Sequence, residues 1–107
     1  MYYISDETIR KVEEVNNYRL SEAQRYYIKN GVWNYPRAAG KKEAYIIRLV
    51  LLKEEYLDIN EIISGKWANS LISIEDRYKT YEHILNLRKK FKEHGIEVIR
   101  LKEETVL

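Results

Sequence analysis

The sequence predicts a mainly α-helical domain that ends in a small C-terminal β-hairpin. Two capping boxes, Ser21–Gln24 and Asp58–Glu61, precede residues whose apolar side chains recur every three or four positions, the helical period. After Gly95, the run Ile96–Leu101 is rich in β-branched residues, and three polar residues separate it from a second apolar run, Thr105–Leu107. These observations favour helices over most of the chain and strands at its end.

The length and composition of the chain exclude several classes of protein. The chain has 107 residues, of which 45% are apolar and 34% are charged, so it fits one folded domain. It contains no cysteine, which excludes a disulfide scaffold and the usual zinc finger. No apolar run approaches the roughly 18 residues of a membrane span, and the first residues do not have the pattern of a signal peptide. We therefore expect a cytoplasmic protein with no membrane contact, no metal and no cofactor.

Residues 1–40 form a predicted N-terminal helical extension with a loop. Ser5 caps a helix of about 12 residues in which apolar residues recur every three positions. The Ser21–Gln24 box opens a second helix that ends at Gly31, and residues 32–40, which hold the only proline, form a linker. The extension has enough apolar surface to dock on the rest of the chain or to form a symmetric interface, and we expect a homodimer.

Residues 41–107 form the predicted functional domain. The segment 41–56 is apolar on almost all sides, which is typical of a helix in the centre of a fold. The Asp58–Glu61 box begins a shorter helix, and a short apolar run follows it. A long helix is then predicted over residues 75–94.

The long helix has two different faces. An apolar stripe is formed by Thr80, Ile84, Leu87 and Phe91, and Tyr81 widens it. At the same spacings, another side carries residue types that hydrogen-bond base edges or hold phosphates, namely Lys79, His83, Asn86 and Lys90. Six Lys or Arg against Glu82 alone give the 16 residues from Arg77 to Lys92 a net charge of +5, in a chain of net charge +2. A local positive field of this kind attracts phosphate.

The predicted order of elements is helix, shorter helix, connector, long basic helix and hairpin. This order predicts a winged helix-turn-helix. In that arrangement the third helix enters the major groove, and the hairpin contacts the backbone beside it. We therefore predict a protein that binds double-stranded DNA. The predicted base-facing residues are Lys79, His83, Asn86 and Lys90, and the predicted phosphate contacts are Arg77, Arg88, Lys89, Lys92, Arg100 and Lys102.

The same region resembles the output domains of bacterial response regulators. His83–Phe91 and His94–Ile99 are similar to the recognition helix and wing of that family, with its His-Ile-x-x-Leu-Arg-x-Lys-Leu pattern and Gly-Ile-x-Ile strand. Glu61–Trp67 is similar to the family's helix that ends in Leu-Trp or Val-Trp. The resemblance covers residues 44–101 and implies a sequence-specific DNA-binding domain that acts as a dimer or in tandem.

The sequence also departs from that family. The wing motif Gly-x-Gly-Tyr is absent from residues 100–107, and helical sequence stands where the family has a β-sheet before its first helix. We therefore expect a winged-helix relative of these domains. The expected function is that of a small transcriptional regulator of phage, plasmid or viral type.

Two other functions fit the sequence. A small protein-interaction or inhibitor protein would use the same scaffold as a rigid surface, with an exposed aromatic patch around Trp33 and Tyr35 and no continuous positive surface. A single-strand binder would stack bases on some of the ten tyrosines, beside the basic residues of segment 32–42. We expect no enzyme and no catalytic residue, because the sequence contains neither a nucleophile–base arrangement nor a glycine loop for phosphate. A metal site is not expected either, since His83 and His94 lie about three helical turns apart.

Overall fold

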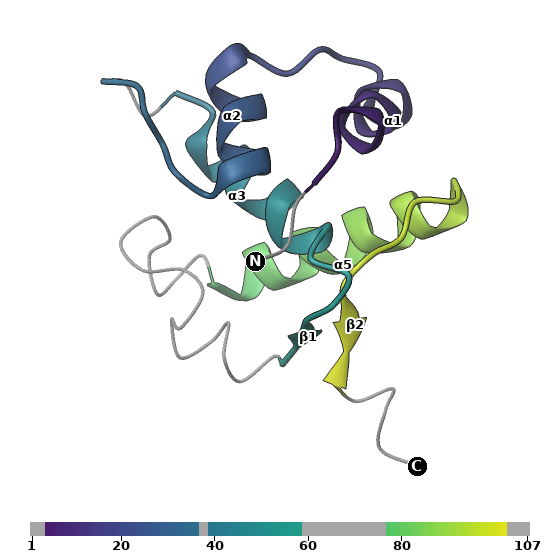
Figure 1. Ribbon diagram of the computed structural model, residues 1–107. Helices are drawn as coiled ribbons and strands as arrows, with labels where there is room; N and C mark the ends of the chain where they lie inside the picture. Colours follow the sequence, from purple (N-terminus) through teal and green to yellow (C-terminus); the bar gives the residue numbers. More distant parts are fainter. Residues whose placement is uncertain (1–3, 37–38, 59–76, 103–107) are drawn as a thin grey trace.

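The computed structural model describes residues 4–36, 39–58 and 77–102, and it is mainly helical in these ranges (Figure 1). The helices are α1 (Asp6–Asn16), α2 (Glu22–Asn30), α3 (Lys41–Val50) and α5 (Arg77–Glu93), and the strands are β1 (Tyr56–Leu57) and β2 (Arg100–Leu101). Helix α3 lies between α2 and α5, and α1 contacts α5. The predicted mainly helical fold is confirmed for this part of the chain.

Both N-terminal helices begin and end where local sequence signals place them. The Ser5 hydroxyl accepts a hydrogen bond from the Thr8 N–H, and α1 stops at Asn17 in the left-handed conformation, φ 57°. At the start of α2, Ser21 and Gln24 bond each other reciprocally, with Oγ accepting from the Gln24 N–H and Oε1 accepting from the Ser21 N–H. Helix α2 ends at Gly31, whose φ is 74°. These two predictions are confirmed.

Helix α3 is the centre of the fold, as its apolar character predicts. Its buried residues are Ala44, Tyr45, Ile46, Ile47, Leu49 and Val50. The predicted extent of this helix, to residue 56, is wrong, because α3 ends at Val50 and Tyr56 lies in β1. The reason is tertiary: the Val50 carbonyl accepts a hydrogen bond of 2.7 Å from the N–H of Ile99, far along the chain. This bond satisfies the end of the helix, and the chain turns so that Leu57 is buried in a strand.

The small sheet differs from the predicted hairpin. Strands β1 and β2 pair in parallel, with Tyr56 opposite Arg100 and Leu57 opposite Leu101. Parallel strands require a long crossover, and α5 lies within it. The predicted second strand at 105–107 and the shorter helix after Asp58 lie outside the described residues, so the hairpin and the complete winged-helix arrangement stay predictions.

Helix α5 buries the stripe that its sequence predicts. Thr80, Ile84, Leu87 and Phe91 are all buried, and Tyr81 packs partly against the core. The helix ends in a Schellman motif at Gly95, where φ is 78°. The Ile96 N–H donates to the Phe91 carbonyl at 3.0 Å, and the Gly95 N–H donates to the Lys92 carbonyl at 3.2 Å.

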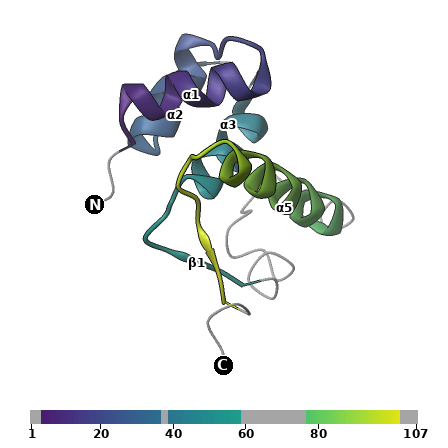
Figure 2. The ribbon, with the colours of Figure 1, turned by 90° about the vertical axis from the view of Figure 1, so that its right-hand side faces the viewer.

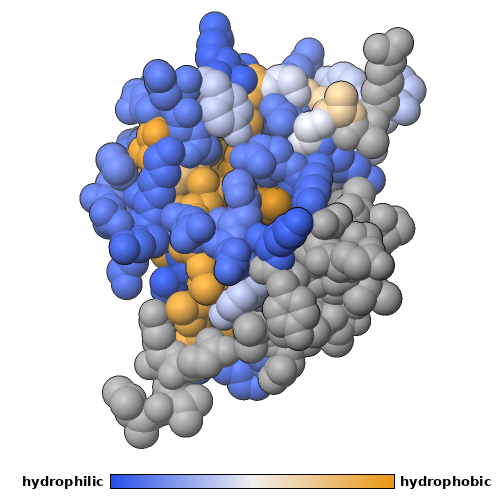
Figure 3. Space-filling model, turned by 180° about the vertical axis from the view of Figure 1, so that it is seen from behind, coloured by the Kyte–Doolittle hydropathy of each residue, from blue (hydrophilic) through white to orange (hydrophobic). Residues whose placement is uncertain are grey.

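One hydrophobic core joins the helices on both sides of residue 40. It includes Val12 of α1, Ile28 of α2, Ile47 of α3 and both Ile84 and Phe91 of α5. Figure 2 shows α1 and α2 above α3 and α5 below it, and α1 also contacts α5. Among the described residues, hydrophilic ones cover most of the surface seen from behind (Figure 3). Within the described ranges, no helix combines the length and apolar character that a membrane span needs.

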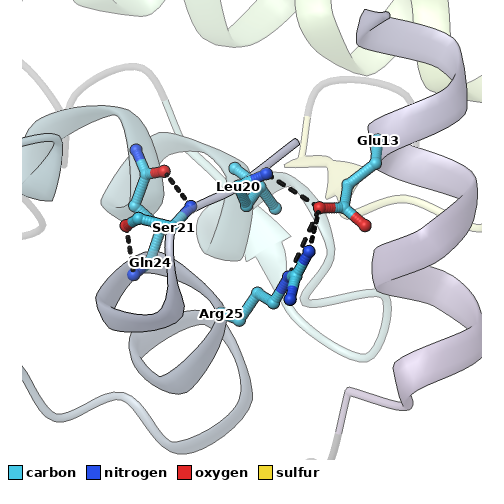
Figure 4. A network of polar contacts seen from close by, with 5 residues as sticks. All are labelled: Glu13, Leu20, Ser21, Gln24 and Arg25. Atoms are coloured by element: carbon cyan, nitrogen blue, oxygen red, sulfur yellow. Dashed lines mark hydrogen bonds and ion pairs between the residues drawn. The ribbon is translucent and has the colours of Figure 1, made fainter. Parts of the chain in front are cut away.

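A single carboxylate connects α1 to the start of α2 (Figure 4). Oε2 of Glu13 accepts hydrogen bonds from the Leu20 N–H at 2.8 Å and from Nη2 and Nε of Arg25 at 2.8 Å and 3.3 Å. These hydrogen bonds, from Arg25 first and also from the Leu20 N–H, lower the pKa of Glu13 against the opposing effect of its burial. The network fixes the turn between the two N-terminal helices.

Candidate nucleic-acid interface

The outward surface of α5 carries the residues that the sequence assigns to base recognition. Lys79, His83, Asn86 and Lys90 are all exposed. They recur at the helical period and therefore form one stripe along the helix. The stripe runs on the flank of α5 that faces the start of α3, because His83 Nε2 lies 3.7 Å from Glu43 Oε2 of that helix.

Four lysines of α5 have no acidic partner in the part of the chain that is described: Lys79, Lys89, Lys90 and Lys92. Three lysines elsewhere are paired: Lys29 lies 2.8 Å from Asp6, Lys53 lies 2.7 Å from Glu97, and Lys102 lies 3.3 Å from Asp58. Lys41 and Lys42 of α3 also have no acidic partner among the described residues, so α5 carries the larger of two groups of unpaired lysines. Two exposed acids, Glu82 and Glu93, lie on the same helix and reduce this field.

The structure gives a different position to Arg88. Its side chain is 9% exposed, and Nε donates a hydrogen bond of 2.7 Å to the carbonyl of Ile99. It therefore ties α5 to the segment before β2 and does not lie on the open surface where a phosphate contact requires it. The helical spacing alone did not separate it from Lys89, its exposed neighbour. We leave Arg88 out of the candidate interface.

The two predicted contacts near β2 are exposed but bound to their own chain. Arg100 donates from Nη2 to the carbonyl of Glu54 at 3.1 Å, and its guanidinium lies 4.0 Å from the centre of the Tyr56 ring. Lys102 pairs with Asp58 at 3.3 Å. The side chain of Arg77, at the start of α5, lies outside the described residues.

Helices α3 and α5 form an open hollow at their first turns, which we call the α3–α5 hollow. It measures about 470 Å³, and its lining residues are Lys42, Glu43, Ile46, Lys79, Thr80 and His83. Oε1 of Glu43 accepts a hydrogen bond of 3.2 Å from the Tyr18 hydroxyl. Partial burial and the charge of Glu43 raise the pKa of Tyr18 to about 12.

Sequence reasoning missed the contribution of α3 to this surface. It placed Lys42 with the aromatic loop before α3, because Lys42 and Lys79 are far apart in the chain. The local signal was present, since two consecutive lysines, Lys41 and Lys42, begin α3. Only the packing of α3 on α5 brings Lys42 beside the stripe of α5.

An aromatic cluster follows α2. The ring of Trp33 makes edge-to-face contacts with Tyr27 and Tyr35, at centroid distances of 6.0 Å and 6.4 Å. Trp33 is half-buried and packs against the core. Around it, Tyr26, Val32 and Tyr35 are 40%, 52% and 39% exposed. The exposed aromatic patch expected of a protein-binding surface is thus present, although Trp33 itself is partly buried against the core.

No group of three His, Asp or Glu side chains placed to hold a metal ion occurs among the described residues. Comparison of the chain with family models, with curated proteins and with solved structures gave no match.

Proposed function

We propose that the chain binds double-stranded DNA through the exposed flank of α5 and acts as a small, sequence-specific transcriptional regulator of the winged helix-turn-helix kind. The observation that carries this proposal is the group of four lysines on α5 that have no acidic partner among the described residues. Unpaired lysines on one exposed helix favour contact with a polyanion, because phosphate would supply the counter-charge that the fold does not.

The shape of α5 supports a major-groove contact. A helix of 17 residues is about 25 Å long, and the major groove admits one α-helix. In this docking, Asn86 reads a base edge from the middle of the stripe, while all four lysines reach phosphates beside it. This proposal moves Lys79 and Lys90 from the base edges, to which the sequence assigns them, to the phosphates. Arg100 and Lys102 contribute phosphate contacts only if they exchange their present partners, Glu54 and Asp58.

The test is a fluorescence-anisotropy titration of the whole chain with random duplex DNA and with single-stranded DNA at several salt concentrations. With four lysine–phosphate contacts, we expect the logarithm of the duplex affinity to fall with a slope of roughly −3.6 against the logarithm of salt concentration. This corresponds to a loss on the order of 100-fold between 50 and 200 mM salt. Absence of duplex binding at low salt would contradict the proposal.

Base reading and phosphate contact are separated by two single variants, tested on a duplex selected for tight binding and on random duplex. Lys89→Ala should weaken both duplexes alike, by about 5-fold near 0.15 M salt, because it removes one charge that is not specific for sequence. Asn86→Ala should weaken the selected duplex about 10-fold and leave the random one nearly unchanged. Equal effects of the two variants on both duplexes would show that these roles are assigned wrongly.

We further propose that the chain acts as a homodimer, because two half-sites multiply a modest affinity for one site. A second candidate function is favoured by the exposed residues Tyr26, Val32 and Tyr35. A protein-interaction or inhibitor protein would use such a patch to bind its partner. A chain that binds neither duplex nor single-stranded DNA at low salt would support this second function.

A further inference from the structure

The α3–α5 hollow has the chemistry of an anion site. Lys42 and Lys79 line it from the two helices, and neither lysine has an acidic partner among the described residues. The acid in the hollow, Glu43, already accepts a hydrogen bond from Tyr18 and lies 3.7 Å from His83. The hollow therefore contains two lysines without an acidic partner and one carboxylate that already has other partners. Its net charge is positive.

The hydroxyl of Thr80 is the second observation that points to a ligand. Thr80 lines the hollow and is 3% exposed, and its Oγ1 has no hydrogen-bond partner among the described residues. By contrast, the hydroxyls of Ser5 and Ser21 accept the hydrogen bonds that cap α1 and α2. A buried hydroxyl without a partner costs stability, so its retention in the wall of an open hollow points to a bound group that completes its hydrogen bond.

The first turn of α3 adds donors to the same place. The residue before it, Gly40, has a φ of 79° and offers no side-chain cap. The first N–H groups of a helix have no partner within the helix, and they carry the positive end of its dipole. Gly40 is held there by α2, since Nε2 of Gln24 donates to the Gly40 carbonyl at 3.1 Å. The positive φ of Gly40 favours glycine here, and a Cβ at this position would also displace that Nε2, which would lie only 2.5 Å away.

We propose that the α3–α5 hollow binds a phosphate group. Lys42 and Lys79 supply the counter-charge, and the Thr80 hydroxyl and the first N–H groups of α3 supply hydrogen bonds. In a DNA complex, the group in the hollow is a backbone phosphate next to the stripe of α5. This identification of the phosphate rests on the proposed function. A free phosphate group has the same chemistry, so the test has one arm for each source.

The first arm uses inorganic phosphate and no DNA. Backbone amide signals of the whole chain are followed by NMR as sodium phosphate replaces sodium chloride at constant ionic strength. We expect saturable shifts at Lys41, Lys42, Glu43 and Thr80. The shifts should be lost in Lys42→Gln and Thr80→Val and kept in Lys11→Gln, which removes an exposed lysine of α1.

The second arm uses random duplex DNA. Lys42→Gln should lower the affinity about 5-fold at 0.15 M salt and reduce the salt slope by about 0.9, because it removes one charged contact. Thr80→Val should lower the affinity about 5-fold without changing the slope, because it removes a neutral hydrogen bond. A purely structural role of Thr80 would not produce this loss of affinity. Valine keeps the shape of the side chain, and the unbound variant should be at least as stable as the unbound wild type.

The two arms separate the possible failures. Phosphate shifts without any duplex binding by the wild-type chain would overturn the proposed function and support a site for a free phosphate group. Weaker duplex binding by Thr80→Val and Lys42→Gln would support a backbone phosphate in the hollow. Unchanged duplex binding by both variants, together with no phosphate shifts at the start of α3, would overturn the inference.

Discussion

Duplex binding should weaken on the order of 100-fold at 0.15 M salt when Lys89, Lys90 and Lys92 are replaced together by glutamine. Each lysine–phosphate contact contributes about 5-fold at this salt concentration through counterion release. The salt slope should fall in magnitude by about 2.7 for the same reason. All three side chains are exposed and have no acidic partner among the described residues, so the free energy of unfolding should change by less than about 0.5 kcal/mol each. Anisotropy titrations and denaturant unfolding measure the two quantities.

The matched control removes the same number of positive charges from α1 and the turn after it. Arg10, Lys11 and Arg19 lie exposed on α1 and on the turn after it. Their triple replacement by glutamine changes the net charge by the same amount and should reduce duplex affinity only a few-fold, through the long-range field. A third variant, Glu82→Gln, removes an exposed acid from α5 and should raise the affinity. Equal losses in the two triple variants would show that net charge, and not the surface of α5, governs binding.

A loss of about 2–3 kcal/mol in the free energy of unfolding is expected for Glu13→Ala. Its Oε2 accepts three hydrogen bonds, from the Leu20 N–H and from two nitrogens of Arg25. Hydrogen bonds to charged groups stabilise more than neutral ones, and removal of the acceptor leaves the N–H of the buried Leu20 unpaired. Denaturant unfolding of the two proteins measures the difference. The control is Glu14→Ala, at the exposed neighbouring position, which should change stability by less than about 0.5 kcal/mol.

The same network predicts a dependence of stability on pH. The folded-state pKa of Glu13 is lowered from 4.5, mainly by the hydrogen bond from Arg25. A carboxyl group whose pKa is lowered by folding stabilises the fold fully when the pH is above its pKa in the unfolded chain. This contribution is lost as the pH falls through its pKa in the folded protein. The stability difference between the wild type and Glu13→Gln should therefore shrink as the pH falls below 4.5. A difference that stays constant down to pH values that protonate Glu13 would show that the hydrogen bonds do not depend on its charge.

Local signals in the sequence determined where most of the described helices lie. Ser5 and Ser21 cap α1 and α2, and Gly31 and Gly95 end α2 and α5, because these caps involve only residues within a few positions of one another. The spacing of Ile84, Leu87 and Phe91 likewise identified the buried side of α5. For the candidate interface, the same spacing identified the exposed stripe of lysines, His83 and Asn86.

Contacts between distant segments decided the rest. Helix α3 ends at Val50 because its last turn bonds Ile99, and Tyr56–Leu57 pairs with Arg100–Leu101 across the whole of α5. Tertiary packing also buries Arg88 against Ile99 and joins Lys42 to Lys79 in the α3–α5 hollow. A periodic pattern fixes which residues share a side of a helix, since that depends on bond geometry within one turn. Which of those sides meets solvent, and which residues from elsewhere join it, depends on how the helices pack, and only the tertiary structure decides that.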